Sequence, residues 1–119
     1  MELYLIHHFE SIEQLIPIIF TSLVLVFVIL LIFFKNKSIN LIYKYTLVLT
    51  TLSGFYGVFL HLNANYEFEV DMAPTASTAD LLLESLSGAL PALAPLSMVV
   101  LALLGYAYLI LINQKNYKY

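Results

Sequence analysis

The stretch Leu15–Phe34, LIPIIFTSLVLVFVILLIFF, is a run of twenty residues without a single charge. A helix of this length extends for roughly 30 Å, which matches the hydrocarbon thickness of a bilayer. Pro17 falls in the first turn of such a helix, where its missing N–H costs little. The stretch therefore predicts a transmembrane helix over residues 15–34.

The composition of the whole chain also indicates a membrane protein. Charged residues make up 11% of the 119 residues and hydrophobic residues 61%, whereas a soluble domain carries about 25% charged residues. This is too little charge to cover a soluble globule, which argues against a soluble enzyme. The absence of cysteine excludes disulfides, thiolate zinc sites, iron–sulfur clusters and cysteine nucleophiles. The net charge of −3 argues against nucleic acid as a partner.

Two further apolar runs predict two more spans, at residues 41–62 and 92–112. A polar turn at residues 35–40 separates the first two spans, and residues 113–119 form a tail after the third. We therefore expect an all-α integral membrane protein, a single membrane domain with three transmembrane helices. An outer acidic loop at residues 63–91 connects the second span to the third.

The charges divide into two groups that predict the orientation of the spans. All lysines flank one side of the spans: Lys35, Lys37, Lys44, Lys115 and Lys118. All acidic residues belong to the other side: Glu2, Glu10, Glu13, Glu67, Glu69, Asp71, Asp80 and Glu84. By the positive-inside rule, the N-terminus lies outside an inner (cytoplasmic) membrane and the C-terminus lies in the cytoplasm.

Two amphipathic segments predict helices that lie on the outer membrane surface. Residues 1–14 place apolar side chains at helical spacing opposite acids, without the basic start and cleavage site of a secretory signal. Residues 78–89 do the same, and Ser77–Asp80 has the form of a capping box. Gly88, Pro91 and Pro95 then predict a break, and residues 81–91 are either interfacial or re-entrant.

The acidic loop contains a segment, residues 66–72, in which apolar and acidic side chains alternate. This period of two predicts an extended segment with Glu67, Glu69 and Asp71 on one face. It is either a loop whose acids meet water or a patch that attracts cations.

Small residues predict where the spans pack. Thr50, Gly54, Gly57 and His61 lie at helical spacing and form one stripe, and small residues on membrane helices let a second backbone approach closely. Ala102 and Gly105 give the third span a small face of its own. The stripe directs His61 toward a helix–helix contact.

His61 is the main candidate for chemistry, and three roles compete for it. The first role is structural: His61 hydrogen-bonds a backbone carbonyl freed near Pro91 or Pro95, or a carboxylate such as Glu84. The second role is proton transfer or contact with a quinone, since histidine titrates near physiological pH. The third role is a metal site, with zinc or copper as the cofactor. Its candidate ligands are His61, His7, His8, Glu67, Glu69 and Glu84.

The sequence contains no phosphate-binding loop, no Ser-His-Asp arrangement and no internal repeat. We therefore expect a non-enzymatic accessory or structural subunit of a larger inner-membrane complex, of respiratory or transport type, whose partners are lipid and larger membrane subunits or copies of itself. The alternative is a homo-oligomeric channel or transporter for protons or metal cations that uses His61 and the outer acids. A third hypothesis is a metal chaperone on the outer face.

Overall fold

The computed structural model describes residues 12–88 and 90–117, and this part of the chain is helical with no strand. A short 3-10 helix η1 (Ile12–Leu15) leads into α2 (Ile16–Phe33), which is followed by α3 (Lys37–Met72), α4 (Thr78–Leu86) and α5 (Leu96–Tyr117). Three of these helices, α2, α3 and α5, are long and apolar enough to cross a membrane. The predicted surface helix of residues 1–14 lies almost entirely outside the described residues.

α2 matches the span predicted over residues 15–34 to within one residue at each end. Pro17 lies in its first turn, where a helix has no hydrogen bond for the missing N–H to break. The helix is apolar on every side and buries only Val24 and Leu31 in the chain. A tight turn follows, in which the side chain of Asn36 accepts a hydrogen bond of 2.8 Å from the backbone N–H of Ser38 and so caps α3.

The second span is much longer than predicted, because α3 continues through 36 residues to Met72. The extended acidic segment predicted at residues 66–72, and with it the start of the outer loop at residue 63, is therefore wrong. Once a helix is nucleated, each added residue gains a hydrogen bond, and residues 58–72 contain no glycine or proline to stop it. Helix α3 extends for roughly 54 Å, well beyond the hydrocarbon thickness of a bilayer.

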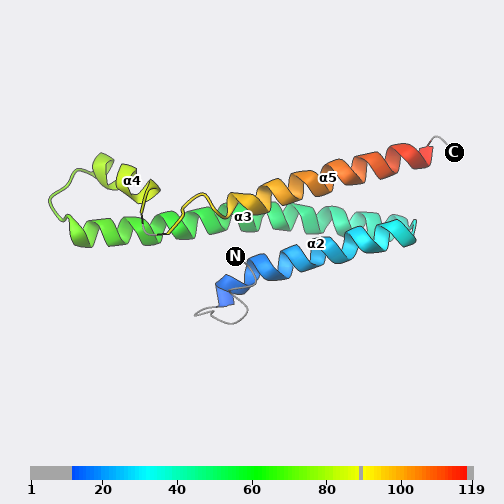
Figure 1. Ribbon diagram of the computed structural model, residues 1–119, viewed down its shortest axis with the longest axis horizontal. Helices are drawn as coiled ribbons and strands as arrows, with labels where there is room; N and C mark the ends of the chain where they lie inside the picture. Colours follow the sequence, from blue (N-terminus) through cyan, green and yellow to red (C-terminus); the bar gives the residue numbers. More distant parts are fainter. Residues whose placement is uncertain (1–11, 89, 118–119) are drawn as a thin grey trace.

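A short loop then reverses the chain, and α4 folds back along the projecting end of α3 (Figure 1). Its start agrees with the predicted capping box, because the Ser77 hydroxyl accepts a hydrogen bond of 3.2 Å from the backbone N–H of Asp80. The helix ends at Leu86, three residues before the predicted end. Its buried residues, Leu81 and Ser85, face α3.

The third span begins later than predicted, at Leu96 rather than Ala92. The two prolines cause the delay, since Pro91 and Pro95 cannot donate the backbone hydrogen bonds of a regular helix. Short-range turn bonds replace the helical ladder here, from Ala94 N to Pro91 O and from Leu96 N to Leu93 O, both 3.0 Å. We call residues 87–95, which contain Gly88, Pro91 and Pro95, the bend.

The three long helices form a flat, open layer rather than a closed bundle (Figure 1). Helix α3 lies in the middle and packs against both α2 and α5, which contact each other only sparsely. The molecule measures 66 × 31 × 18 Å. In the most apolar part of each span, only 11% (α2), 17% (α3) and 22% (α5) of the residues are buried. Most of the apolar surface is therefore left for lipid or another protein to cover.

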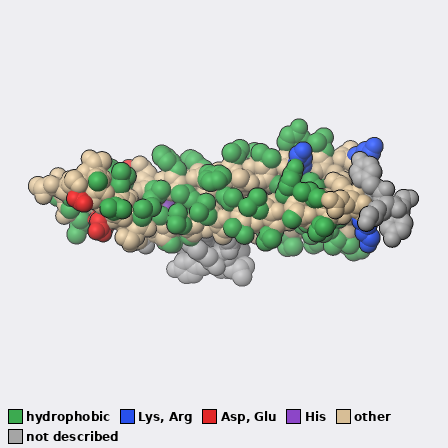
Figure 2. All heavy atoms as spheres, turned by 90° about the horizontal axis from the view of Figure 1, so that it is seen from above, with side chains coloured by type: hydrophobic (Ala, Val, Ile, Leu, Met, Phe, Trp, Pro, Cys, Tyr) green, Lys and Arg blue, Asp and Glu red, His purple; other side chains and the backbone are tan. Residues whose placement is uncertain are grey.

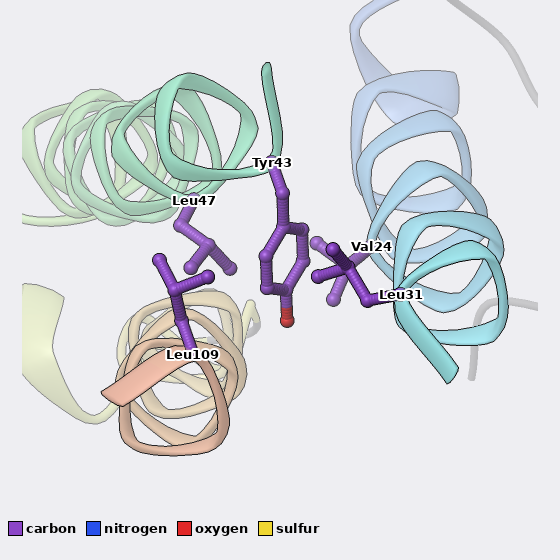
Figure 3. Close-up of a cluster of buried hydrophobic side chains, with 5 residues drawn as sticks. All are labelled: Val24, Leu31, Tyr43, Leu47 and Leu109. Atoms are coloured by element: carbon purple, nitrogen blue, oxygen red, sulfur yellow. The ribbon is translucent and has the colours of Figure 1, made fainter. Parts of the chain in front are cut away.

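A small core joins the spans near their lysine-bearing end (Figure 3). The ring of Tyr43, which is fully buried, lies between α2 and α5, and its neighbours are Val24, Leu31, Leu47 and Leu109. Nearby, Asn40 of α3 donates a hydrogen bond of 3.0 Å to the side-chain oxygen of Asn113 in α5. At the opposite end of the molecule lie the acidic side chains (Figure 2). The two kinds of charge are thus separated in space as well as in sequence.

Candidate functional site at the bend

A groove of about 530 Å³ lies where the start of α2, the acid-bearing half of α3 and the bend meet. It brings together segments that are far apart in the chain. Its lining is apolar for the most part and includes Glu13, Gln14, Ile16, Pro17, Ser53, Tyr56, Gly57, Leu60, His61, Asn63, Ala64, Glu67, Leu90, Pro91, Ala94, Pro95, Ser97 and Met98. A pocket that is mostly apolar, with a few polar groups, is the usual form of a ligand site. The groove is therefore the candidate functional site.

The glycines of α3 lie against the bend and α5, and Gly57 also lines the groove. A Cβ added at Gly57 would lie 2.7 Å from Cβ of Pro95, and one at Gly54 would lie 2.9 Å from Cγ2 of Val99. Thr50 is fully buried, and its hydroxyl donates a hydrogen bond of 2.8 Å to the carbonyl of Thr46. In the predicted stripe, Gly54 thus lies against the bend and α5 of the same chain, and Thr50 is buried.

The small face predicted on α5 also lies against α3. Ala102 is buried, and a Cβ added at Gly105 would lie 2.6 Å from both the hydroxyl of Tyr43 and Cδ2 of Leu47. A larger residue here would require the Tyr43 and Leu47 side chains to shift, so the glycine allows the present close packing.

His61 is half-buried in the groove wall and hydrogen-bonded to the bend. Its Nδ1 lies 3.0 Å from the carbonyl oxygen of Pro91. Because a carbonyl oxygen only accepts, Nδ1 carries the proton, and Nε2 of the neutral ring is then an acceptor. Of the roles considered for His61, this geometry matches the first, a hydrogen bond to a carbonyl freed near the prolines. No hydrogen bond joins His61 to Glu84.

Asn65 is a second polar residue at the bend, and the sequence reasoning missed it. It is only 2% exposed, and its side-chain nitrogen donates hydrogen bonds of 2.8 Å to the carbonyls of both Ser85 and Leu90. Its oxygen accepts a bond of 3.0 Å from the N–H of Leu90. A Cβ added at Gly88 would lie 2.6 Å from Cγ of Asn65, so this glycine makes room for the amide. The amide therefore fastens both α4 and the bend to α3.

Of the predicted metal ligands that the structure describes, only His61 and Glu67 line the groove together. Glu67 lines the groove with His61 and accepts a hydrogen bond of 2.7 Å from Asn63, whereas Glu69 and Glu84 lie outside the groove lining. Glu13, from η1, takes a place in the groove that the sequence did not predict. Within residues 12–88 and 90–117, no three His, Cys, Asp or Glu side chains are placed to hold a metal ion. The candidates His7 and His8 lie outside the described residues.

Several tyrosine hydroxyls in the spans have no hydrogen-bond partner in the described part of the chain. The hydroxyl of Tyr43 is buried and unpartnered. Tyr56, in the groove lining, is 46% exposed. Tyr106, in the middle of α5, is 43% exposed. In water such hydroxyls would hydrogen-bond to solvent, but the hydrocarbon of a bilayer has no hydrogen-bond donors or acceptors.

The fold places the chain in the class of all-helical proteins with three helices long and apolar enough to span a membrane. No protein-family model matches the chain, and no curated protein or solved structure matches it either. The function therefore has to be argued from the geometry of the chain itself.

Proposed function

We propose that the chain is a non-catalytic accessory subunit of a larger inner-membrane complex, which it contacts through the outward face of α5. The observation that carries this proposal is the position of Tyr106. It is the eleventh of the 22 residues of α5, and it lies nine residues, or roughly 13 Å of helix, before Lys115. Side chains on a helix tilt toward its N-terminus, so this ring leans away from the lysine-bearing end and toward the middle of the bilayer.

A tyrosine hydroxyl at that depth needs a partner. It has none in the described part of its own chain, and lipid tails cannot supply one. An acceptor on a neighbouring transmembrane helix satisfies it, and such bonds contribute about 1 kcal/mol between membrane helices. The large uncovered apolar surfaces of α2 and α5 give the same neighbour room to pack.

The flat shape of the chain favours an accessory role over transport. The groove is confined to the acid-bearing half, and between it and the lysine-bearing end lies the core around Tyr43. Residues 12–88 and 90–117 of a single chain therefore enclose no passage that joins the two ends. The alternative, a homo-oligomeric cation channel, requires a pathway between copies, but Thr50 of the stripe is buried and Gly54 lies against Met98 and Val99 of α5.

The test compares two tyrosine variants in the assembled complex. Tyr106→Phe removes only the hydroxyl, and we expect its association with the larger subunits to weaken about fivefold. Tyr45→Phe is the matched control, because Tyr45 is 64% exposed close to the lysine-bearing end, where water and head groups satisfy a hydroxyl. Association is followed by co-purification over a detergent series. Equal retention of both variants would contradict the role of Tyr106.

We further propose that the acid-bearing end lies outside the inner membrane and the lysine-bearing end in the cytoplasm, as the positive-inside rule predicts. Because the chain has no cysteine, single-cysteine variants need no background substitution. On intact cells, a membrane-impermeant maleimide should label Thr75→Cys, in the loop before α4, and leave Ser38→Cys unlabelled. The opposite labelling pattern would reverse the orientation.

A further inference from the structure

The groove at the bend lies at the depth where lipid head groups meet the hydrocarbon. His61 follows Lys37 by 24 residues of continuous helix, or roughly 36 Å, slightly more than the thickness of the hydrocarbon core. Glu67 lies further out on the same helix, and Ser53 lies eight residues, or roughly 12 Å, further in. The groove thus extends from the head-group layer into the layer of the acyl chains.

The outer rim of the groove carries hydrogen-bond acceptors. The carboxylates of Glu13 and Glu67 come from two different elements, and Nε2 of His61 is an acceptor while Nδ1 donates to Pro91. Among the described residues, no lysine lines the groove. Such a rim favours a head group that ends in an ammonium with N–H donors, and it disfavours a head group with a net negative charge.

Below the rim, the polar groups are of the opposite kind. Tyr56 and Ser97 have hydroxyls that can donate, and neither has a hydrogen-bond partner in the described part of the chain. Tyr56 lies five residues further in than His61, or roughly 7 Å along α3. The ester carbonyl oxygens of a phospholipid, which only accept, lie in the layer just below the head groups. The order of acceptors above donors therefore complements an ammonium group above esters.

The deepest lining is apolar and includes Ile16, Pro17, Pro95 and Met98. The delayed start of α5 leaves space here, because the bend replaces what would have been the first turn of the span. An acyl chain lying along this surface covers it without any polar contact.

We propose that the groove is a binding site for a membrane phospholipid with a primary ammonium head group, of the phosphatidylethanolamine type. Glu13, Glu67 and Nε2 of His61 form the acceptor rim that attracts the ammonium group and accepts its hydrogen bonds. The ester carbonyls accept hydrogen bonds from Tyr56 and Ser97, and one acyl chain fills the apolar inner part. The site is independent of the proposed contact at Tyr106, which lies on α5 at a different depth and outside the groove lining.

Native mass spectrometry of the purified, delipidated full chain tests the proposal with three lipids that have identical acyl chains. Phosphatidylethanolamine should bind at least about fivefold more tightly than phosphatidylcholine, whose quaternary ammonium has the same charge but no N–H donor. Phosphatidylglycerol, which is anionic, should bind most weakly. Equal retention of the three lipids, or a preference for phosphatidylglycerol, would overturn the proposal. So would a stable homodimer that excludes lipid, because a second copy would then occupy the groove.

Two variants locate the site. Glu13→Gln and Glu67→Gln, on separate elements, should each reduce the preference for phosphatidylethanolamine by about fivefold or more. Glu69→Gln is the matched control, since this acid lies two residues from Glu67 but outside the groove lining, and it should leave the preference unchanged. Helix content and thermal stability, measured on each variant, separate lost binding from lost folding. An equal effect of all three variants would mean that net charge, and not the groove, selects the lipid.

Discussion

Replacing Asn65 by alanine tests how the bend is held. The amide of Asn65 makes three hydrogen bonds, to the carbonyls of Ser85 and Leu90 and from the N–H of Leu90. Each buried hydrogen bond contributes about 1 kcal/mol, so Asn65→Ala should weaken the docking of α4 and the bend by about 3 kcal/mol. At tenfold for every 1.4 kcal/mol, local opening becomes about 100-fold more frequent.

Hydrogen exchange measured by mass spectrometry on the chain in nanodiscs reports this opening directly. Amides of α4 and of Leu90 should exchange about 100-fold faster in Asn65→Ala, while amides in the middle of the spans stay protected. Asn65→Asp should act at least as strongly, because a carboxylate cannot donate to the two carbonyls. Asn63→Ala is the control, since the Asn63 amide binds only the exposed Glu67. If Asn65→Ala exchanged like Asn63→Ala, the bend would not depend on this amide and the reasoning would be refuted.

Four further variants probe the contacts of the helices. Their effects are measured by reversible unfolding in micelles or by hydrogen exchange of α4. Gly57→Ala places a Cβ 2.7 Å from the ring of Pro95, so it should destabilise the chain by about 1–3 kcal/mol. Unchanged stability would show that the bend is free to move away from α3. Tyr43→Phe removes a buried, unpartnered hydroxyl. It should stabilise the chain by about 1 kcal/mol and reduce the cost of Gly105→Ala, whereas a loss of stability would reveal a partner for the hydroxyl. Ser77→Ala removes the N-cap of α4 and should lower the stability of this helix by about 1 kcal/mol. Hydrogen exchange should then become about fivefold faster in α4 alone. Exchange as slow as in the unaltered chain would mean that packing on α3, and not the cap, sets the stability of α4.

The spans were predictable because they depend on composition and length alone. An uncharged apolar run as long as Leu15–Phe34 is typical of a transmembrane helix, and the bounds of α2 agree with it to within one residue at each end. The start of α4 was predictable for a local reason, because Ser77 and Asp80 satisfy each other within a single turn. Both features need no knowledge of what lies elsewhere in the chain.

The end of α3 and the role of Asn65 were not predictable in this way. Alternating acids at residues 66–72 resemble an exposed strand, but the helix that precedes them is already nucleated and Pro74 is the first residue that opposes it. Asn65 falls within the loop predicted at residues 63–91, whereas α3 extends past it to Met72. Its partners are 20 and 25 residues further along the chain, and only the folded bend brings them within reach.

The mass of the particle that contains this chain, measured by native mass spectrometry after gentle extraction from the membrane, tests the accessory role most directly. The account predicts one copy of the 13.5 kDa chain in fixed proportion to larger membrane subunits, and partial loss of the chain from that particle when Tyr106 is changed to phenylalanine. A particle that contains only this chain, as a monomer or as a homo-oligomer, would contradict it.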